Sequence, residues 1–374
     1  MSETVSGVEL RSRVEADATL TITLETVEHE KPIGDEILVR MAAAPVNPSD
    51  LVLVLGPADL ETMRATADGL VFDIPASRMS AQANRIGQSL VVGNEGAGIV
   101  EAAGPDAQQL IGRKVALTGG GMYASLRKIS ATQAIELPDE VSPADGASAT
   151  INPMTALAMV ETARMGGHQA IVHTAAASNL GQMLNRVCIE DGIGLVNIVR
   201  SAAQAKILRD AGARYVVDSS AADFSEQLDA ALSATGAVLA FDAIGGGDLA
   251  AQILVGMEAV ASRGAAFSRY GSAVHKQVYI YGRLNPAPIA VTGSIGMAWG
   301  IGGFLLSSFL AQAGPERATA MRRRVMAGLR TTFASSYAGT VSLTDLLEPD
   351  TLRKLTRRAT GEKYLVDPSL RDPA

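Results

Sequence analysis

The chain has 374 residues and a net charge of −7, from 39 acidic and 32 basic side chains. An acidic chain repels nucleic-acid phosphates, so we expect no nucleic-acid partner, and Arg322–Arg324 is interpreted as the solvated face of a helix. Hydrophobic residues make up 47% of the chain, enough for the buried cores of two domains. The single cysteine, Cys188, excludes an internal disulfide and is predicted to be a buried thiol.

The uncharged segment from residue 284 to 315 is long enough to cross a bilayer. Prolines, glycines and hydroxyl side chains interrupt it, however, so we expect no membrane partner. We interpret it as a buried strand at about 289–294, a glycine turn and a core helix from about Gly303. The first residues lack the pattern of a signal peptide, and we expect a cytoplasmic enzyme that acts on a small-molecule substrate.

The first 152 residues are rich in predicted strands, at 20–24, 36–40, 90–101 and 113–117, with glycines that supply turns. They predict a barrel-like β domain. Strands and helices then alternate: strands at 169–174, 195–200, 215–218 and 237–242, and helices at 180–191, 202–211, 224–233 and 249–259. This alternation predicts an α/β domain with a doubly wound parallel sheet over 153–313. Two helical stretches and a strand at 364–366 follow in a segment, 314–374, that we expect to return to the first domain.

The first strand–helix turn of this α/β domain predicts a dinucleotide site. It contains no GxGxxG, but its small side chains let the backbone approach a diphosphate, and the helix start offers free N–H groups. Gly181 lets the helix pack against the strand. Ser178 or Asn179 can also act simply as the helix cap. The predicted cofactor contacts of this turn are Thr174, Ala177, Ser178, Asn179, Leu180 and Gly181.

The ends of the second and fourth strands extend the predicted site. An NAD site usually has an acidic residue after the second strand, whereas this chain has Arg200 and Ser201, which suit a 2′-phosphate. We therefore favour NADP(H) as the cofactor; the alternative for Arg200 is a salt bridge with a helix carboxylate. After the fourth strand, Ala243, Ile244 and Gly245 are expected beside the nicotinamide half.

Several segments, taken in their order and spacing, resemble the medium-chain dehydrogenase/reductase superfamily, in particular its zinc-free quinone reductase and enoyl reductase branches. These segments are Asn47–Asp50, Gly93–Gly98, Gly112–Val115, Gly121–Ala124, Asn152–Leu157 and Gly361–Val366. The resemblance covers nearly the whole chain. It implies a GroES-like catalytic domain, a Rossmann domain with the active site between them, and a homodimer commonly built by edge strands of the Rossmann sheets, a role that suits residues 284–312.

The resemblance also bears on the metal. Zinc alcohol dehydrogenases of this superfamily place cysteine, histidine and cysteine where this chain has Asn47, Asn94 and a residue near Ile151. Without thiolate or imidazole ligands a tetrahedral zinc site does not form, so we expect no metal. The remaining chemistry is hydride transfer to a quinone or an α,β-unsaturated carbonyl whose oxygen is polarised by hydrogen bonds.

Three residues are candidates for that polarising role: Asn47 as an amide donor, Tyr123 as a phenol donor or proton source, and Thr155 as a hydroxyl near the nicotinamide. Asn47 can alternatively shape the Asn-Pro turn, and Tyr123 can be a core aromatic with its hydroxyl at the surface.

Two other functions stay open. The first is enoyl thioester reduction, although the related enzymes carry a tyrosine where this chain has Ala58. The second is a non-catalytic nucleotide-binding protein on the same fold, because the Ala-Ala-Ala-Ser-Asn turn is degenerate. An insertion between Gly56 and Gly93 is either a lid or pocket wall beside the cleft or a surface elaboration.

Overall fold

The computed structural model describes residues 4–357 and 360–370. The chain forms two compact units. The first unit combines the residues up to Ile151 with those from Met326 onward, and the second runs from Asn152 to Val325. Each unit has its own hydrophobic core.

The first unit is built from a five-stranded and a seven-stranded sheet. The seven-stranded sheet has the order β10-β8-β7-β3-β20-β19, and its seventh strand, β9, also pairs with β3. Its strands are β3 (Glu36–Pro45), β7 (Glu95–Ala103), β8 (Lys114–Thr118), β9 (Leu126–Ser130), β10 (Ala134–Glu136), β19 (Gly339–Val341) and β20 (Tyr364–Val366). Short helices connect them: α1 (Pro48–Leu55), α3 (Pro143–Gly146) and α11 (Pro349–Thr356). The strands predicted at 20–24, 36–40 and 113–117 are present, whereas the one predicted at 90–101 is divided into β6 (Ser89–Val91) and β7, which belong to different sheets.

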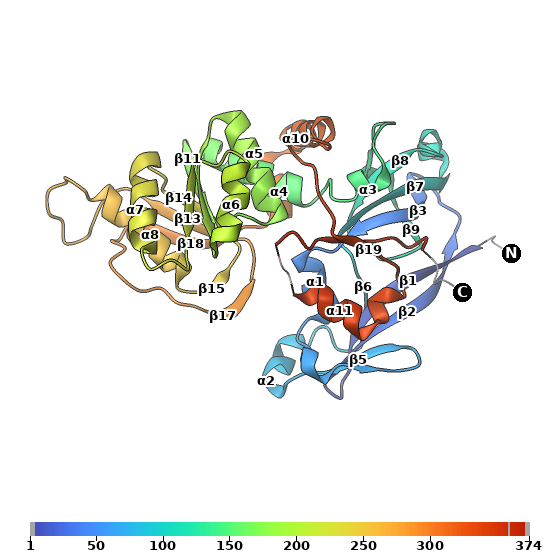
Figure 1. Ribbon diagram of the computed structural model, residues 1–374. Coiled ribbons are helices and arrows are strands. Elements are labelled where there is room, and N and C mark those ends of the chain that lie inside the picture. Colours follow the sequence, from blue (N-terminus) through green and yellow to red (C-terminus); the bar gives the residue numbers. More distant parts are fainter. Residues whose placement is uncertain (1–3, 358–359, 371–374) are drawn as a thin grey trace. The chain divides into compact units, whose positions relative to one another are not determined.

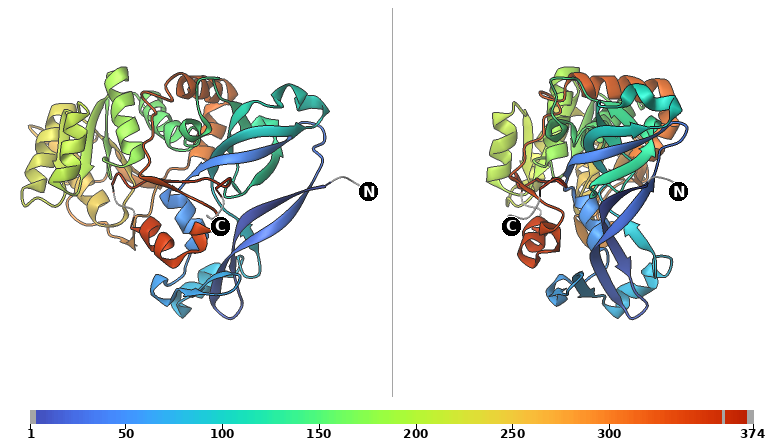
Figure 2. Two further views of the ribbon diagram at one scale, coloured as in Figure 1. Left: turned by 45° about the vertical axis from the view of Figure 1, so that its right-hand side comes forward. Right: turned by 90° about the vertical axis from the view of Figure 1, so that its right-hand side faces the viewer.

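The insertion is an integral part of the five-stranded sheet. That sheet has the order β4-β5-β2-β1-β6 and consists of β1 (Thr4–Val14), β2 (Thr19–Glu30), β4 (Arg64–Ala65), β5 (Gly69–Asp73) and β6 (Ser89–Val91). Strand β5 pairs with β2 near the turn of the long β1–β2 hairpin, which is dark blue in Figure 2. Within the insertion Phe72 is fully buried, and Arg78 in α2 (Ala76–Met79) donates to the Pro57 carbonyl. The insertion therefore contributes to the core of the first unit.

The second unit contains a six-stranded parallel sheet in the order β13-β12-β11-β14-β16-β18. Its strands are β11 (Ala170–His173), β12 (Gly194–Val199), β13 (Tyr215–Asp218), β14 (Leu239–Asp242), β16 (Lys276–Ile280) and β18 (Trp299–Gly303). Helices α4 (Asn152–Met165), α5 (Asn179–Asp191) and α6 (Ala202–Asp210) lie on one face, and α7 (Phe224–Thr235) and α8 (Leu249–Ala261) on the other (Figure 1). The doubly wound sheet predicted from the sequence is confirmed.

The region from 276 to 313 differs from the prediction. The strand expected at 289–294 is wrong: β17 lies earlier, at Asn285–Ile289, and pairs with β15 (Gly245–Gly247). The helix expected from Gly303 is α9 (Leu306–Ala313), and its only buried residue is Phe309. Strand β16 escaped prediction because Lys276 and Gln277 break its apolar pattern, although Lys276 is fully buried beside Glu258.

Helix α10 (Pro315–Ala327) lies mostly in the second unit, so the return to the first unit begins at Met326 rather than near 314. Ion pairs hold this helix: Arg317 meets Glu161 of α4 at 3.5 Å, and Arg324 meets Asp191 of α5 at 2.7 Å. Arg324 is thus paired, unlike the solvated arginine expected from the sequence. Among the described residues, no helix is long and apolar enough to span a membrane.

Candidate functional site

The turn between β11 and α5 lies where the strand order of the sheet reverses, since β11 has β12 on one side and β14 on the other. This is the place where open parallel sheets bind ligands. Ser178 caps α5: its Oγ accepts the Gly181 N–H at 3.1 Å. A Cβ on Gly181 would lie 2.2 Å from the Ala176 carbonyl oxygen, so this position requires glycine. The helix start is therefore drawn tightly against the turn.

Most polar side chains of this turn already have partners within the protein. The Asn179 amide accepts from Asn152 at 3.1 Å, and Gln182 donates to the Ala177 carbonyl at 2.9 Å. In the described part of the chain, the backbone N–H groups of Ala177 and Leu180 meet no acceptor. These two donors, the positive end of a 13-residue helix and the small side chains beside them fit a diphosphate.

Asp242 organises the ends of β11 and β14. Its carboxylate accepts the Thr174 hydroxyl at 2.6 Å and the N–H groups of Ile244 and Gly245 at 2.9 and 3.0 Å. The Ala243 N–H in turn donates to the Thr174 hydroxyl at 2.8 Å. The structure thus brings four predicted contacts together around Asp242. The backbone N–H groups of these residues are already bonded within the protein. Only their carbonyl groups and the shape of the turn are therefore available to a ligand.

Arg200 lies directly after β12 and its side chain is exposed. Its backbone N–H donates to Gln204 Oε1 at 3.0 Å, and the Ser201 hydroxyl caps α6 by accepting the Gln204 N–H at 3.3 Å. Within residues 4–357 and 360–370 the Arg200 guanidinium has no ion-pair partner, so the alternative salt bridge is absent there. A free cation at this strand end fits a 2′-phosphate.

The first unit contains a buried cluster around Glu95. The Glu95 carboxylate accepts the Asn47 side-chain amide at 3.0 Å, the Thr150 N–H at 3.0 Å and the Ile151 N–H at 2.8 Å. Asn47 is also the N-cap of α1, and its backbone N–H donates to Asp50 at 2.8 Å. Asn47 therefore shapes the helix start, as the alternative reading expected, and commits its amide to a carboxylate.

Asp50 links this cluster to Tyr123. Burial raises the pKa of Asp50 to about 7, although the backbone N–H groups of Asn47 and Asn94 oppose the shift. The Tyr123 hydroxyl is buried and donates to the Pro45 carbonyl at 3.1 Å. Burial, together with the nearby carboxylates, raises the pKa of Tyr123 well above its ordinary value. Tyr123 is therefore a neutral core residue, and its hydroxyl does not reach the surface.

Thr155 belongs to α4 in the second unit, so the three predicted catalytic residues are divided between the units. Sequence reasoning missed Lys363, which donates to Ser148 Oγ at 2.7 Å and lies 5.7 Å from the centre of the Tyr337 ring. Burial lowers the pKa of Lys363 to about 8, while Glu95 and Asp50 oppose the shift. The available signals were its place in the Gly361–Val366 segment and its position just before a strongly apolar strand.

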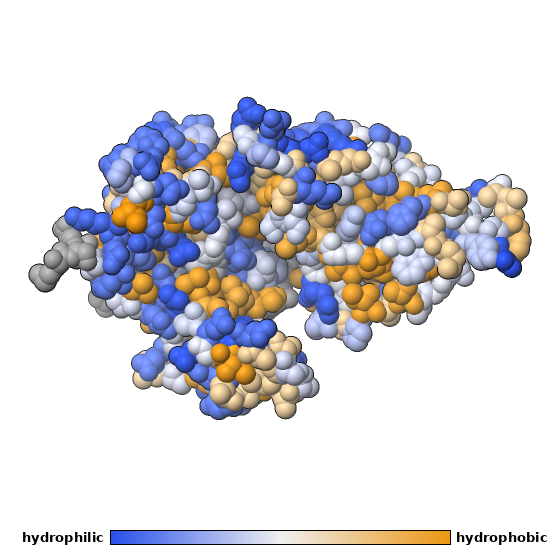
Figure 3. Space-filling view, turned by 180° about the vertical axis from the view of Figure 1, so that it is seen from behind, coloured by the Kyte–Doolittle hydropathy of each residue, from blue (hydrophilic) through white to orange (hydrophobic). Residues whose placement is uncertain are grey.

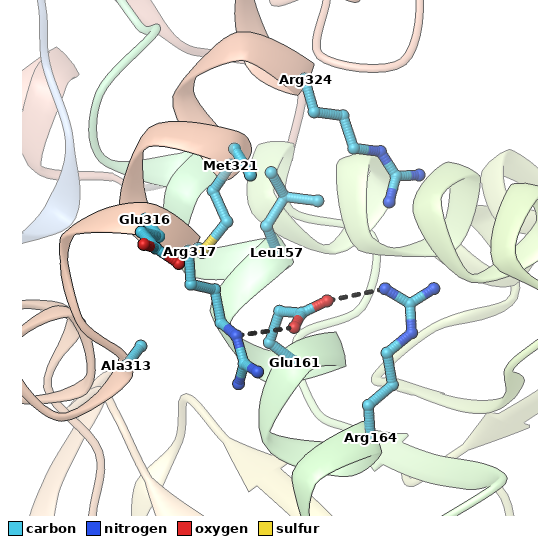
Figure 4. A pocket seen from close by; sticks show the side chains of 9 residues that line it. Leu157, Glu161, Arg164, Ala313, Glu316, Arg317, Met321 and Arg324 are labelled. Atoms are coloured by element: carbon cyan, nitrogen blue, oxygen red, sulfur yellow. Dashed lines mark hydrogen bonds and ion pairs between the residues drawn. The ribbon is translucent and has the colours of Figure 1, made fainter.

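A hollow of about 450 Å³ lies between α4 and α10 (Figure 4). Glu161 bridges Arg164 and Arg317, at 2.7 and 3.5 Å, and Asp191 meets Arg164 at 3.0 Å. Because these arginines are paired with carboxylates, the described residues that line the hollow offer no free cation to an anionic ligand. It is part of the ion-pair network that holds α10.

No group of three His, Cys, Asp or Glu side chains in the described residues lies close enough to hold a metal ion. Cys188 is buried in α5, and burial raises the pKa of its thiol to about 12. This thiol is therefore protonated at neutral pH, as expected for a structural cysteine.

The chain is similar to known proteins in sequence and in fold. The family model of the alcohol dehydrogenase GroES-like domain matches residues 34–139. The mitochondrial enoyl-[acyl-carrier-protein] reductase of Xenopus tropicalis is 27% identical over 206 residues, which cover 52% of this chain and 51% of that protein. The chain thus spans about half the length of this relative.

Two solved structures share the fold along nearly the whole chain. A protein of Mesorhizobium loti assigned as an NADPH:quinone reductase has a TM-score of 0.73 at 24% identity, covering 98% of this chain and 100% of that one. A mycobacterial protein in complex with NADPH has a TM-score of 0.66 at 20% identity, covering 96% and 100%. On these grounds, residues 34–139 are similar to the GroES-like domain of alcohol dehydrogenases, and nearly the whole chain shares the fold of these two solved structures.

Proposed function

We propose that the protein is an NADPH-dependent oxidoreductase that reduces a quinone or an α,β-unsaturated carbonyl without zinc. The observation that carries the proposal is the pair of backbone N–H groups at Ala177 and Leu180, at the start of α5, which meet no acceptor among the described residues. The Arg200 guanidinium at the next strand end, which has no ion-pair partner in the described part of the chain, supports NADPH over NADH. When bound, the cofactor supplies a hydride, and the residues of the turn hold and orient its diphosphate.

The experiment follows cofactor oxidation with quinones, enones and enoyl thioesters as acceptors. Binding is measured separately by titrating NADPH against the fluorescence of Trp299, the single tryptophan of the chain. We expect saturable binding and turnover with at least one quinone or enone. Saturable binding without any turnover would favour a non-catalytic nucleotide-binding protein, and absence of binding would refute the cofactor site.

A second candidate is an enoyl thioester reductase, because the Xenopus tropicalis relative carries that name. Ala58 argues against it, since this position is buried and lacks the phenol that the related enzymes use. Turnover of a crotonyl thioester that exceeds turnover of every quinone and enone would favour this second candidate.

Because the Asn47 amide donates to the Glu95 carboxylate, we propose that the hydroxyl of Thr155 provides the hydrogen bond to the acceptor oxygen. Tyr123 can serve as a proton source only after its hydroxyl leaves the Pro45 carbonyl. Tyr123→Phe tests this role. A loss of about tenfold or more in kcat with unchanged NADPH affinity would support a proton source, and unchanged kcat would restrict Tyr123 to packing.

We also propose a cytoplasmic homodimer. Strand β18 is the last strand of the six-stranded sheet, and no described strand pairs with its outer edge. Figure 3 shows hydrophobic residues gathered on the second unit, and Met297 and Leu305, which flank β18, are 73% and 64% exposed. Sedimentation of the Met297→Glu, Leu305→Glu double variant should give a monomer where the parent protein gives a dimer. A monomeric parent protein would contradict the proposal.

A further inference from the structure

The segment after β16 holds Arg283 at a fixed place beside the candidate cofactor site. The Leu284 N–H donates to the Ala243 carbonyl at 3.1 Å, and the Asn285 N–H donates to the Ile244 carbonyl at 2.9 Å. On the other side of Arg283, a Cβ on Gly282 would lie 2.6 Å from the Ala243 oxygen. The backbone on both sides of Arg283 therefore lies against the turn that follows β14.

The side chain of Arg283 uses space that a glycine leaves open. A Cβ on Gly245 would lie 2.9 Å from Arg283 Cδ, so the aliphatic stem lies over this glycine. The guanidinium is exposed, and its contacts to the Pro286 and Ala287 carbonyls, at 3.4 and 3.5 Å, are long for hydrogen bonds. The position of the stem is thus set by packing, while the charged group keeps its donors for another partner.

No carboxylate of the described residues forms an ion pair with Arg283. The next 32 residues along the chain, up to Pro315, carry no charge. Asp242, at the end of the neighbouring strand, already accepts from Thr174 and from two backbone N–H groups. The cation is therefore uncompensated within the second unit.

The sheet order separates Arg283 from the phosphates of the cofactor. The turn proposed for the diphosphate follows β11, and Arg200 follows β12, whereas Arg283 follows β16, two strands from β11 on the opposite side. Neighbouring strands are about 4.8 Å apart, so Arg283 lies roughly 10 Å along the sheet from the diphosphate turn. That side of the switch point is the nicotinamide half, where the acceptor is reduced.

We propose that Arg283 selects acceptors that carry an anionic group, of the carboxylate class, close to the bond that is reduced. This inference rests on the proposed function and names the substrate class of the same site. A guanidinium pairs with a carboxylate through two parallel N–H bonds, which gives both affinity and orientation. The phosphates of a thioester carrier lie at the far end of a long arm, so such an acceptor does not meet this requirement.

The test compares matched acceptors with NADPH as donor. The first pair is 4-oxopent-2-enoate and its methyl ester, and the second is crotonyl-CoA and crotonyl N-acetylcysteamine. The measured quantity is the ratio of kcat/KM for the anionic member to that for the neutral member. We expect Arg283→Gln to lower this ratio about tenfold for the first pair, the effect of one charge-assisted hydrogen bond. Arg283→Lys should retain most of the preference, and Arg269→Gln, which removes a cation from an exposed loop, serves as the control.

Each outcome decides the matter. A loss confined to the carboxylate pair supports the inference. An unchanged ratio overturns it while leaving the proposed function intact, because turnover of the methyl ester reports that function independently. An effect on the thioester pair alone would place Arg283 at a carrier and overturn the inference. A rise in the NADPH Kd as large as the change in the kcat/KM ratio would place Arg283 at the cofactor and also overturn the inference. Absence of turnover with every acceptor removes the proposed function and this inference together.

Discussion

Arg200 offers the sharpest test of cofactor choice. Its guanidinium is exposed at the end of β12 and lacks an ion-pair partner within the described residues, so Arg200→Gln removes a cation without leaving a carboxylate unpaired. One charge-assisted bond to a 2′-phosphate contributes about 2 kcal/mol, near the lower part of its range because the site is open to solvent. This free energy corresponds to a rise of about 30-fold in the Kd of NADPH. The Kd of NADH, which lacks that phosphate, should change less than about twofold.

Isothermal titration at low ionic strength measures both constants, and a second series at higher salt should shrink the NADPH effect. Arg209→Gln is a matched control, since it removes an exposed arginine from the last turn of α6, the helix that follows Arg200. Arg200→Gln keeps the bond from its own backbone N–H to Gln204. Equal losses for NADPH and NADH, or a similar loss in Arg209→Gln, would refute the assignment of Arg200 to the 2′-phosphate.

Three further predictions concern stability and are measured by urea unfolding. Gly181→Ala places a methyl group 2.2 Å from the Ala176 carbonyl oxygen and should lower the free energy of unfolding by about 1–3 kcal/mol, and an unchanged midpoint would contradict the close contact. Lys276→Met leaves Glu258 charged and buried and should cost about 3–5 kcal/mol at pH 7. Burial opposes the charged form of Glu258, but hydrogen bonds from Lys276 and its neighbours outweigh burial and lower the pKa of Glu258 to about 2. The loss of stability caused by Lys276→Met should therefore shrink as pH falls from about 4.5 to 2. A loss of stability that is independent of pH would count against the ion pair. Asp50 has its pKa raised from 3.8 to about 7, so the folded chain retains a proton that the unfolded chain loses, and stability from this group should fall as pH rises between these values. Asp50→Asn should flatten that slope, and an equal slope in both proteins would refute the assignment.

The sequence was sufficient to predict those strands and helices whose hydrophobic pattern matches the burial of their side chains. Strands β11 to β14 are short apolar runs between amphipathic helices, and their order along the chain predicts the parallel sheet. Strand β16 escaped because its first residue is a fully buried lysine, which sequence patterns assign to the surface. The partner that makes this burial possible, Glu258, lies in the preceding helix and becomes visible only in the folded chain.

The residues of the candidate site likewise fall into those that the sequence could predict and those that it could not. The turn from Thr174 to Gly181 was found because close backbone approach demands small residues at adjacent positions. Asn47 was also found, but its partner Glu95 lies 48 residues away, and nothing local indicates that pairing. Arg283 was missed because an exposed arginine has no distinctive pattern; only the glycine beneath its stem and the absence of a carboxylate among the described residues set it apart.

The pairing of β20 with β3 has a consequence for folding during synthesis. Leu365 and Val366 add to the edge of a strand that ends at Pro45, and β19 completes the sheet through β20. The ribosome therefore releases the whole of the second unit, a continuous stretch ending at Val325, before the last strands of the first sheet exist. The N-terminal part of the first unit is therefore synthesised early but keeps an unpaired edge on β3 while the second unit folds. Arrested chains that stop before Tyr364 should accordingly contain a protease-resistant second unit and an unprotected first one.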